Sequence, residues 1–354
     1  MTPALIVAVF MVAALIIYAL MGGADFGGGM WDFLATGPRA VRQKEVIARA
    51  IGPIWEANHV WLILVVVLLF TGFPLAFAAI MTALNIPITL VLVGVILRGS
   101  TFIFRTYDRR TDVVQRRWSI VFGLSSFFTP FVEGITVGAL ATGQIRVSDG
   151  RLTSGFFSGW LTPFSFACGV FAVALFAFLA ATYMTVETED EPDLQEDFRR
   201  RAMWAGLILI PIALTAFLLA RSGAPWIFAG LTRWWAPFLL GGTSCCALAA
   251  LLTLWRRKFF LARVAAIGQV TLILCGWSLA QYPNFVTPDL TFANSAAPAV
   301  TLRLLIIALA LGAVLLFPSL YFLFRLFKGS QPPVRQETSE GEQIERLTTA
   351  PDSP

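Results

Sequence analysis

Long apolar runs recur along this chain and leave few folds open to it. They are about 20 residues long, the length that a helix needs to cross a hydrocarbon core about 30 Å thick. Of the 354 residues, 57% are hydrophobic and 13% are charged, and that charge is roughly half of what a soluble chain carries. An isolated span must satisfy its backbone hydrogen bonds internally, and the runs lack the alternation of membrane barrel strands. We therefore predict an all-α, multi-pass membrane protein.

Apolar length and polar interruptions predict about nine spans. They cover approximately residues 4–21, 60–72, 75–97, 118–141, 160–183, 203–221, 235–255, 262–282 and 302–324. No Lys or Arg precedes the first run, so we expect an uncleaved first span and not a signal peptide. The predicted domains are a membrane domain over 1–328 and a disordered cytoplasmic tail over 329–354, which is rich in Pro, Ser, Thr, Glu and Gln.

Basic residues concentrate in alternate loops, and Arg98 is counted among these loop charges. The opposite loops hold only Arg146, Arg151, Arg221, Arg233 and Arg303. Cytoplasmic loops carry the excess of Lys and Arg, so we expect the N-terminus outside and the C-terminus in the cytoplasm. An odd number of spans agrees with that orientation. Short basic loops between spans also make nucleic-acid binding a poor interpretation.

Polar residues cluster at the start of the second span, in residues 51–74. Glu56, Asn58 and His59 lie there between Trp55 and Trp61. Glu56 and His59 are three residues apart and would share one face of a helix. A partly desolvated carboxylate can bind and release protons near neutral pH. The alternative is a carboxylate that only benefits from the helix dipole.

Asp25 lies in the sequence GGADFGGG, at the predicted cytoplasmic end of the first span. No Lys-Ser or Lys-Thr follows, so a phosphate-binding loop is not indicated. The glycines are expected to end the helix or to admit another backbone closely. A carboxylate at this position needs an interaction partner, contact with water or a functional role.

A polar stripe is predicted on span 118–141, where Ser125, Thr129 and Glu133 are each four residues apart. Glu133 lies deep enough to be a functional candidate that faces the bundle or a partner and not lipid. The alternative is a protonated acid that is hydrogen-bonded within the bundle. Beside it, Gly134 and Gly138 form a GxxxG pair, which permits close helix contact.

His59 is the chain's only histidine, so a bis-histidine haem site cannot form within it. The four cysteines lie in apolar runs without a CxxC spacing, which favours buried thiols over a metal site. We expect this chain to ligate no metal. Residues 281–284 with Asn294, rich in amides and prolines, suggest a fixed cap or an interface at the outer end.

Several segments together match a known family. They are GADFGGG at 23–29, IGPIWEANHVWL at 51–62, FVEGITVGA at 131–139, and YPN with NSAA at 282–284 and 294–297. The chain resembles subunit II of cytochrome bd-type quinol oxidases up to about residue 329. The tryptophan-acid-x-asparagine-x-tryptophan core is the most specific of these motifs.

The resemblance implies a membrane-embedded heterodimer in the bacterial inner membrane. Its partner, subunit I, would carry two b-type haems and one d-type haem, oxidise quinol and reduce dioxygen to water. A small single-span subunit can accompany the pair. The present chain would hold no catalytic residue and no haem, would stabilise the haem subunit and would help to conduct cytoplasmic protons. Some members hold a structural quinone in this subunit.

The family motifs carry over to Asp25 and Glu56 as proton-pathway acids, and His59 and Glu133 are added as candidates. Motif support is expected from Trp55, Asn58, Trp61, Asn284 and Asn294. Three features depart from the family: Gly22 stands where an Asp is frequent, Glu56 and Ala57 replace Asp and Gly, and His59 and Glu133 are unusual.

Two other functions stay open. One is a proton-coupled secondary transporter or channel that uses Asp25, Glu56 and Glu133 as coupling sites. The other is a structural scaffold within the oxidase, with inert carboxylates. A haem spectrum of the purified protein would separate the oxidase from the transporter.

Overall fold

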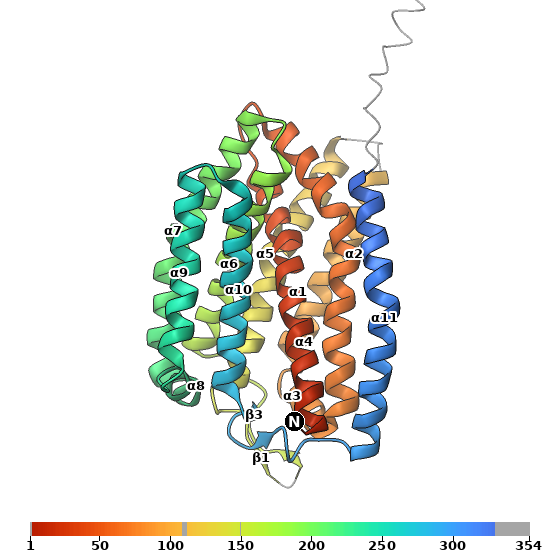
Figure 1. Cartoon of the computed structure of the whole chain (residues 1–354), viewed down its shortest axis with the longest axis vertical. Helices are drawn as coiled ribbons and strands as arrows, with labels where there is room; N and C mark the ends of the chain where they lie inside the picture. Colours follow the sequence, from red (N-terminus) through yellow and green to blue (C-terminus); the bar gives the residue numbers. More distant parts are fainter. Residues whose placement is uncertain (1, 108–111, 149, 330–354) are drawn as a thin grey trace, which may run out of the picture. The chain divides into compact units, whose positions relative to one another are not determined.

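The computed structural model describes residues 2–107, 112–148 and 150–329. The predicted tail lies outside this range from residue 330 onward. The chain divides into two units, residues 1–308 and 309–354, and the candidate site described below lies wholly in the first. Figure 1 shows helices running side by side through this first unit.

Helices make up most of the described chain. They are α1 (Pro3–Phe33), α2 (Ala40–Gly72), α3 (Pro74–Ala83), α4 (Asn85–Tyr107), α5 (Asp112–Ala141), α6 (Pro163–Glu187), α7 (Pro192–Gly223), α8 (Pro225–Leu231), α9 (Ala236–Trp255), α10 (Phe259–Gln281) and α11 (Ala299–Gly329). Among the described residues, eight helices are long and apolar enough to cross a membrane, and the bent α2 brings the number to nine. The predicted all-α, multi-pass fold is confirmed.

The predicted end of the first span is wrong, because α1 continues through GGADFGGG to Phe33. The glycines lie where neighbouring helices approach α1. A Cβ atom at Gly27 would overlap the backbone of Phe176, and one at Gly29 would overlap Ser126. The alternative expectation, close approach of another backbone, is therefore the correct one.

Two other predicted boundaries also differ. Residues 75–97 do not form one span, since α3 ends at Ala83 and α4 begins at Asn85. Pro87 lies in the first turn of α4, where a missing backbone N–H breaks no helical hydrogen bond. Helix α2 begins at Ala40, and its segments Ala40–Gly52 and Ala57–Gly72 meet at an angle of 45°.

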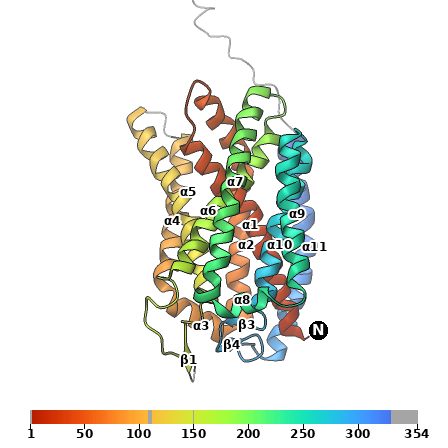
Figure 2. The ribbon, with the colours of Figure 1, turned by 90° about the vertical axis from the view of Figure 1, so that its left-hand side faces the viewer.

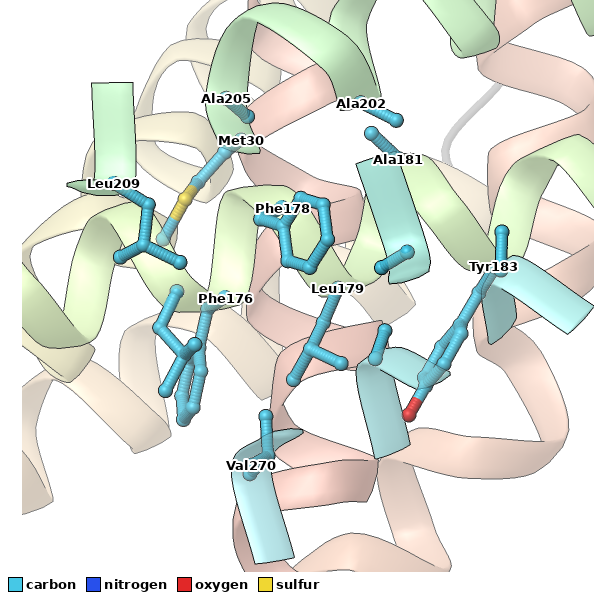
Figure 3. Packing of buried hydrophobic residues seen from close by; sticks show 14 of the residues in the cluster. Met30, Phe176, Phe178, Leu179, Ala181, Tyr183, Ala202, Ala205, Leu209 and Val270 are labelled. Atoms are coloured by element: carbon cyan, nitrogen blue, oxygen red, sulfur yellow. The ribbon is translucent and has the colours of Figure 1, made fainter. Parts of the chain in front are cut away.

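Helix α1 lies at the centre of the first unit and packs against α2, α5, α6 and α10. Its side chains join a buried cluster with α6, α7 and α10. Figure 3 shows Phe178 of α6 with Met30 of α1 and Ala205 of α7 gathered around it. Phe178 is 1% exposed and Met30 is fully buried. Close packing of this kind holds membrane helices together, because lipid tails are as apolar as the core.

The GxxxG pair on α5 packs directly on α6. A Cβ atom at Gly134 would lie 2.5 Å from the backbone oxygen of Cys168 and 2.7 Å from Cα of Gly169. The reverse contact is equally tight, since a Cβ at Gly169 would meet the backbone oxygen of Phe131 at 2.6 Å. The predicted close helix contact is confirmed.

Gly134→Leu should destabilise the chain by about 1–3 kcal/mol or more, because the new side chain has no space between the two backbones. Thermal unfolding of the purified protein measures the effect. Gly241→Leu in α9 is the matched control, since nothing lies within 4 Å of its Cβ position. Equal shifts for both variants would contradict this account of the contact.

A folded cap closes the end of the first unit opposite the α1–α2 connection. It contains the hairpins β1–β2 (Val147–Ser148 and Arg151–Leu152) and β3–β4 (Asn284–Val286 and Leu290–Thr291). Arg146 binds Asp289 with two nitrogens at 2.8 and 3.1 Å, and this pairing holds the pKa of Asp289 below its usual range. The predicted fixed cap is therefore present.

Candidate functional site

A buried ion pair occupies the interior of the bundle. Asp25 of α1 is fully buried, and Arg98 of α4 is 2% exposed. Arg98 Nη1 lies 2.7 Å from Asp25 Oδ1, and Arg98 Nη2 donates to the backbone oxygen of Asp25 at 2.6 Å. Two predictions are thereby corrected: Asp25 does not lie at a helix end, and Arg98 is not a loop charge. Burial of either charge alone would be costly, so the two residues depend on each other.

The Arg98 guanidinium is held on three sides. The rings of Phe26 and Phe122 lie 4.8 and 4.9 Å from its central carbon, and Nε donates to Ser126 Oγ at 3.2 Å. Cations over aromatic faces are stabilised when they are removed from water. Neither carboxylate oxygen of Asp25 has an aligned hydrogen bond in the described part of the chain, although Oδ1 lies in ion-pair contact. The carboxylate therefore keeps free capacity to accept hydrogen bonds.

A second polar pair joins the same stripe of α1 to α5, with Tyr18 buried and Glu133 half-buried. Tyr18 precedes Asp25 by seven residues, a spacing that places both on one helix face. Its hydroxyl donates to Glu133 Oε1 of α5 at 2.5 Å. Asp25 lies within electrostatic reach of both members of this pair. Of the orientations expected for Glu133, toward the bundle or toward a partner, the hydrogen bond shows the first, and Tyr18 is a partner that the sequence did not indicate.

Helix α2 brings further polar groups to this stripe. Asn58 is fully buried, and its amide nitrogen lies 3.4 Å from where a Cβ of Gly22 would be. His59 Nδ1 lies 2.7 Å from the backbone oxygen of Trp55. Both amide atoms of Asn58 and Nε2 of His59 are buried without a hydrogen-bond partner in the described chain. Such groups are rare in proteins and mark places where a proton or water can be bound.

The other residues predicted for the site lie in two places, on α2 and in the cap. On α2, Trp61 is 7% exposed, and the ring of Trp55 packs against the rings of His59 and Phe102. Asn284 and Asn294 belong to the cap, where Asn284 pairs with Thr291 through its backbone and Asn294 donates to the backbone oxygen of Asp289. The side chain of Glu56 lies outside the described part of the structure.

The predicted stripe on α5 does not act as one unit. Ser125 donates to the backbone oxygen of Phe122 and lines a groove of about 650 Å³ between α4, α5 and α6. Thr129 faces Gly94 of α4, where a Cβ atom would overlap its hydroxyl. The groove is otherwise lined by apolar residues, so it suits the hydrocarbon part of a lipid or an isoprenoid.

The described residues contain no group of three or more His, Cys, Asp or Glu side chains that could hold a metal ion. His59 Nδ1 lies beside a backbone oxygen, and its other nitrogen lies in a packed interior near Phe26. The single histidine of the chain cannot supply both ligands of a bis-histidine haem.

The fold and the site define a class: a multi-span helical membrane protein with ionisable residues paired inside its bundle. Residues 3–327 match the family described as cytochrome bd terminal oxidase subunit II. The chain belongs to this family.

Relatives from two bacteria support the assignment. The chain is 23% identical over 346 residues to the "putative cytochrome bd menaquinol oxidase subunit II" of Bacillus subtilis, covering 95% of this chain and 99% of the relative. It is 30% identical over 225 residues to the "cytochrome bd-I ubiquinol oxidase subunit 2" of Escherichia coli K12, covering 61% and 55%. The bd oxidase structure from Geobacillus thermodenitrificans shares the fold, with a TM-score of 0.79, 22% identity, and coverage of 94% of this chain and all of that one.

Proposed function

We propose that this chain supports a bd-type quinol oxidase by stabilising its haem subunit and by conducting cytoplasmic protons toward the site of oxygen reduction. The observation that carries the proposal is the presence of two polar pairs inside the bundle, the buried Asp25–Arg98 pair and the Tyr18–Glu133 pair. Ionisable groups inside a membrane bundle are costly and are typical of proton relays. The family assignment favours this role over a transporter or channel.

The proposed direction of proton transfer depends on which end of the bundle carries the excess of basic residues. Figures 1 and 2 show the α1–α2, α6–α7 and α9–α10 connections at the same end. Ion pairs join them, including Arg42 with Glu191, Arg257 with Glu196, and Arg263 with Glu187. Arg98 leaves the loop count, but the residues around these three connections include eleven of the 26 Lys and Arg residues, against five in the opposite loops. By the positive-inside rule, this excess supports a cytoplasmic location for this end and an N-terminus outside.

The proposed partners and cofactors follow the family. Subunit I would hold two b-type haems and one d-type haem, and would bind quinol and dioxygen in the bacterial inner membrane. A small single-span subunit would complete some complexes. The apolar groove of α4, α5 and α6 is the place in this chain where a quinone tail or a lipid chain would fit. Among the described residues that line the groove, Ser125 alone has a polar side chain, and its hydroxyl already donates to the backbone oxygen of Phe122 in the same helix.

Glu56→Gln is the substitution that tests a proton relay through Glu56. If Glu56 passes protons, oxygen consumption by the purified complex should fall by about tenfold or more, and its dependence on pH should change. Haem content should stay at the level of the unaltered complex.

Glu45→Gln is the matched control, because it is the same change on the same helix at a side chain that is 54% exposed. An unaltered rate and pH profile in Glu56→Gln would refute a relay through Glu56 and favour an inert scaffold. A complex that purifies without any haem absorption would favour the transporter.

A further inference from the structure

A second polar site lies at the basic end of the bundle, apart from the Asp25 cluster. It is a pocket of about 440 Å³ between the α1–α2 connection and the first turns of α7. Three arginines, Arg39, Arg200 and Arg201, line it together with one carboxylate, Asp197. Figures 1 and 2 both place these two segments at one end of the first unit.

Asp197 is already fully engaged. It accepts from Arg39 Nε and Nη2 at 2.9 and 2.7 Å, and from Gln43 Nε2 at 2.8 Å. These bonds hold the pKa of Arg39 above its usual range. The single acid that lines the pocket therefore balances Arg39, and no second carboxylate among the described lining residues balances Arg200 or Arg201.

Arg201 has no carboxylate at ion-pair distance within the described chain. Its Nη2 donates to Gln43 Oε1 at 2.7 Å, and its guanidinium lies 5.3 Å from the Trp31 ring and 5.4 Å from the Phe198 ring. These contacts fix the head group in position. Its Nη1 is buried without a hydrogen-bond partner. A guanidinium fixed beside a pocket is suited to an anion with several acceptor oxygens.

Two neighbouring features add to this preference. Arg200 is 71% exposed and makes one contact of 3.3 Å with Glu196, so most of its donors are free for a ligand. The α2 helix begins at Ala40 without a side-chain cap, and a helix N-terminus favours negative charge. A phosphate group can accept hydrogen bonds from more than one arginine at once, which suits a pocket lined by three of them.

The surroundings favour a phosphate that is attached to a membrane lipid. Large apolar side chains stand exposed on both sides of the connection: Phe33 is 38%, Leu34 is 46% and Val41 is 71% exposed. Acyl chains could cover these side chains while the head group enters the pocket. Basic pockets between helices on the cytoplasmic side of membrane proteins are typical sites for anionic head groups.

We infer that the pocket formed by Arg39, Arg200, Arg201 and Asp197 binds the phosphate of an anionic phospholipid head group. The site is independent of the proposed proton path. Its effect would be to hold the α1–α2 connection against α7 by a bound ligand, in addition to the Arg39–Asp197 pair. Inorganic phosphate has the same chemistry and is the other source to be distinguished.

The test uses the purified, delipidated oxidase complex with the full chain. Phosphatidylglycerol, phosphatidylcholine and inorganic phosphate are added separately, and bound lipid is measured by native mass spectrometry beside the thermal unfolding midpoint. Arg201→Gln and Arg200→Gln remove donors from the pocket. Arg256→Gln is the control, since it is an exposed arginine at the same end that does not line the pocket.

Phosphatidylglycerol should bind the unaltered complex and Arg256→Gln equally, and at least about tenfold more weakly after either pocket substitution. A phosphate effect that competes with the lipid and depends on the same arginines would assign the site to the phosphate group itself. If Arg201→Gln fails to fold, the lipid binding of Arg200→Gln decides the test, because Arg200 is largely exposed and its replacement should not disturb folding. Equal lipid binding in all variants, or no preference over phosphatidylcholine together with no phosphate effect, would overturn the inference.

Discussion

Arg98→Met should prevent the chain from accumulating in an assembled complex. The substitution leaves Asp25 buried in the bundle without its counter-charge. Loss of one partner of a buried ion pair costs about 3–5 kcal/mol, which is a large share of the roughly 5–15 kcal/mol that keeps a typical protein folded. The yield of haem-containing complex from membranes measures the result.

Removing both charges should restore assembly. In Asp25→Leu/Arg98→Met no charge remains to be buried, and apolar side chains of similar volume often replace a buried pair without loss of stability. Thr101→Val serves as a control on α4, because the buried Thr101 hydroxyl donates only to backbone oxygens of its own helix. Full yield of the Arg98→Met variant would show that the pair is not needed for folding.

Glu133→Leu should lower oxygen consumption by about tenfold or more while the complex still assembles. Glu133 accepts a hydrogen bond from Tyr18, which shares a face of α1 with Asp25, so its removal would interrupt the row of polar groups that leads to Asp25. Proton transfer by a positioned side chain typically contributes about 10²–10⁴-fold to a rate. Tyr18→Phe should have a smaller effect, because the carboxyl group itself is retained. Turnover per haem is the quantity to measure.

Thr136→Val is the matched control for Glu133, since Thr136 lies three residues further along α5 and donates to the backbone oxygen of Val132. A lower yield with normal turnover per haem would make Glu133 a contact to subunit I. If both yield and turnover were unchanged, neither role would stand.

The sequence predicted the features that depend on local composition. Apolar length gave the membrane spans, and the depth of Glu133 within its span indicated that this acid faces the bundle or a partner and not lipid. These predictions succeed because a hydrocarbon environment allows few alternatives to a helix for any apolar run. The GxxxG contact was also predictable, because two glycines one turn apart leave a flat surface on which another helix can pack.

Features that depend on tertiary pairing were not predictable in the same way. Arg98 was placed in a loop because a lone charge usually ends a span, yet the apolar residues Phe102, Ile103 and Phe104 after it continue the helix. Its burial requires Asp25 on another helix, far away in the sequence. Tyr18 was missed because a tyrosine counts as apolar in a span, although its buried hydroxyl needs a partner.

Oxygen consumption by the Asp25→Leu/Arg98→Met complex is the measurement that tests the proposed proton path most directly. This variant should assemble with its haems, which separates conduction from folding. We predict turnover per haem at least about tenfold below that of the unaltered complex, with a haem spectrum that does not change. Unaltered turnover in a fully assembled complex would contradict a proton path through Asp25.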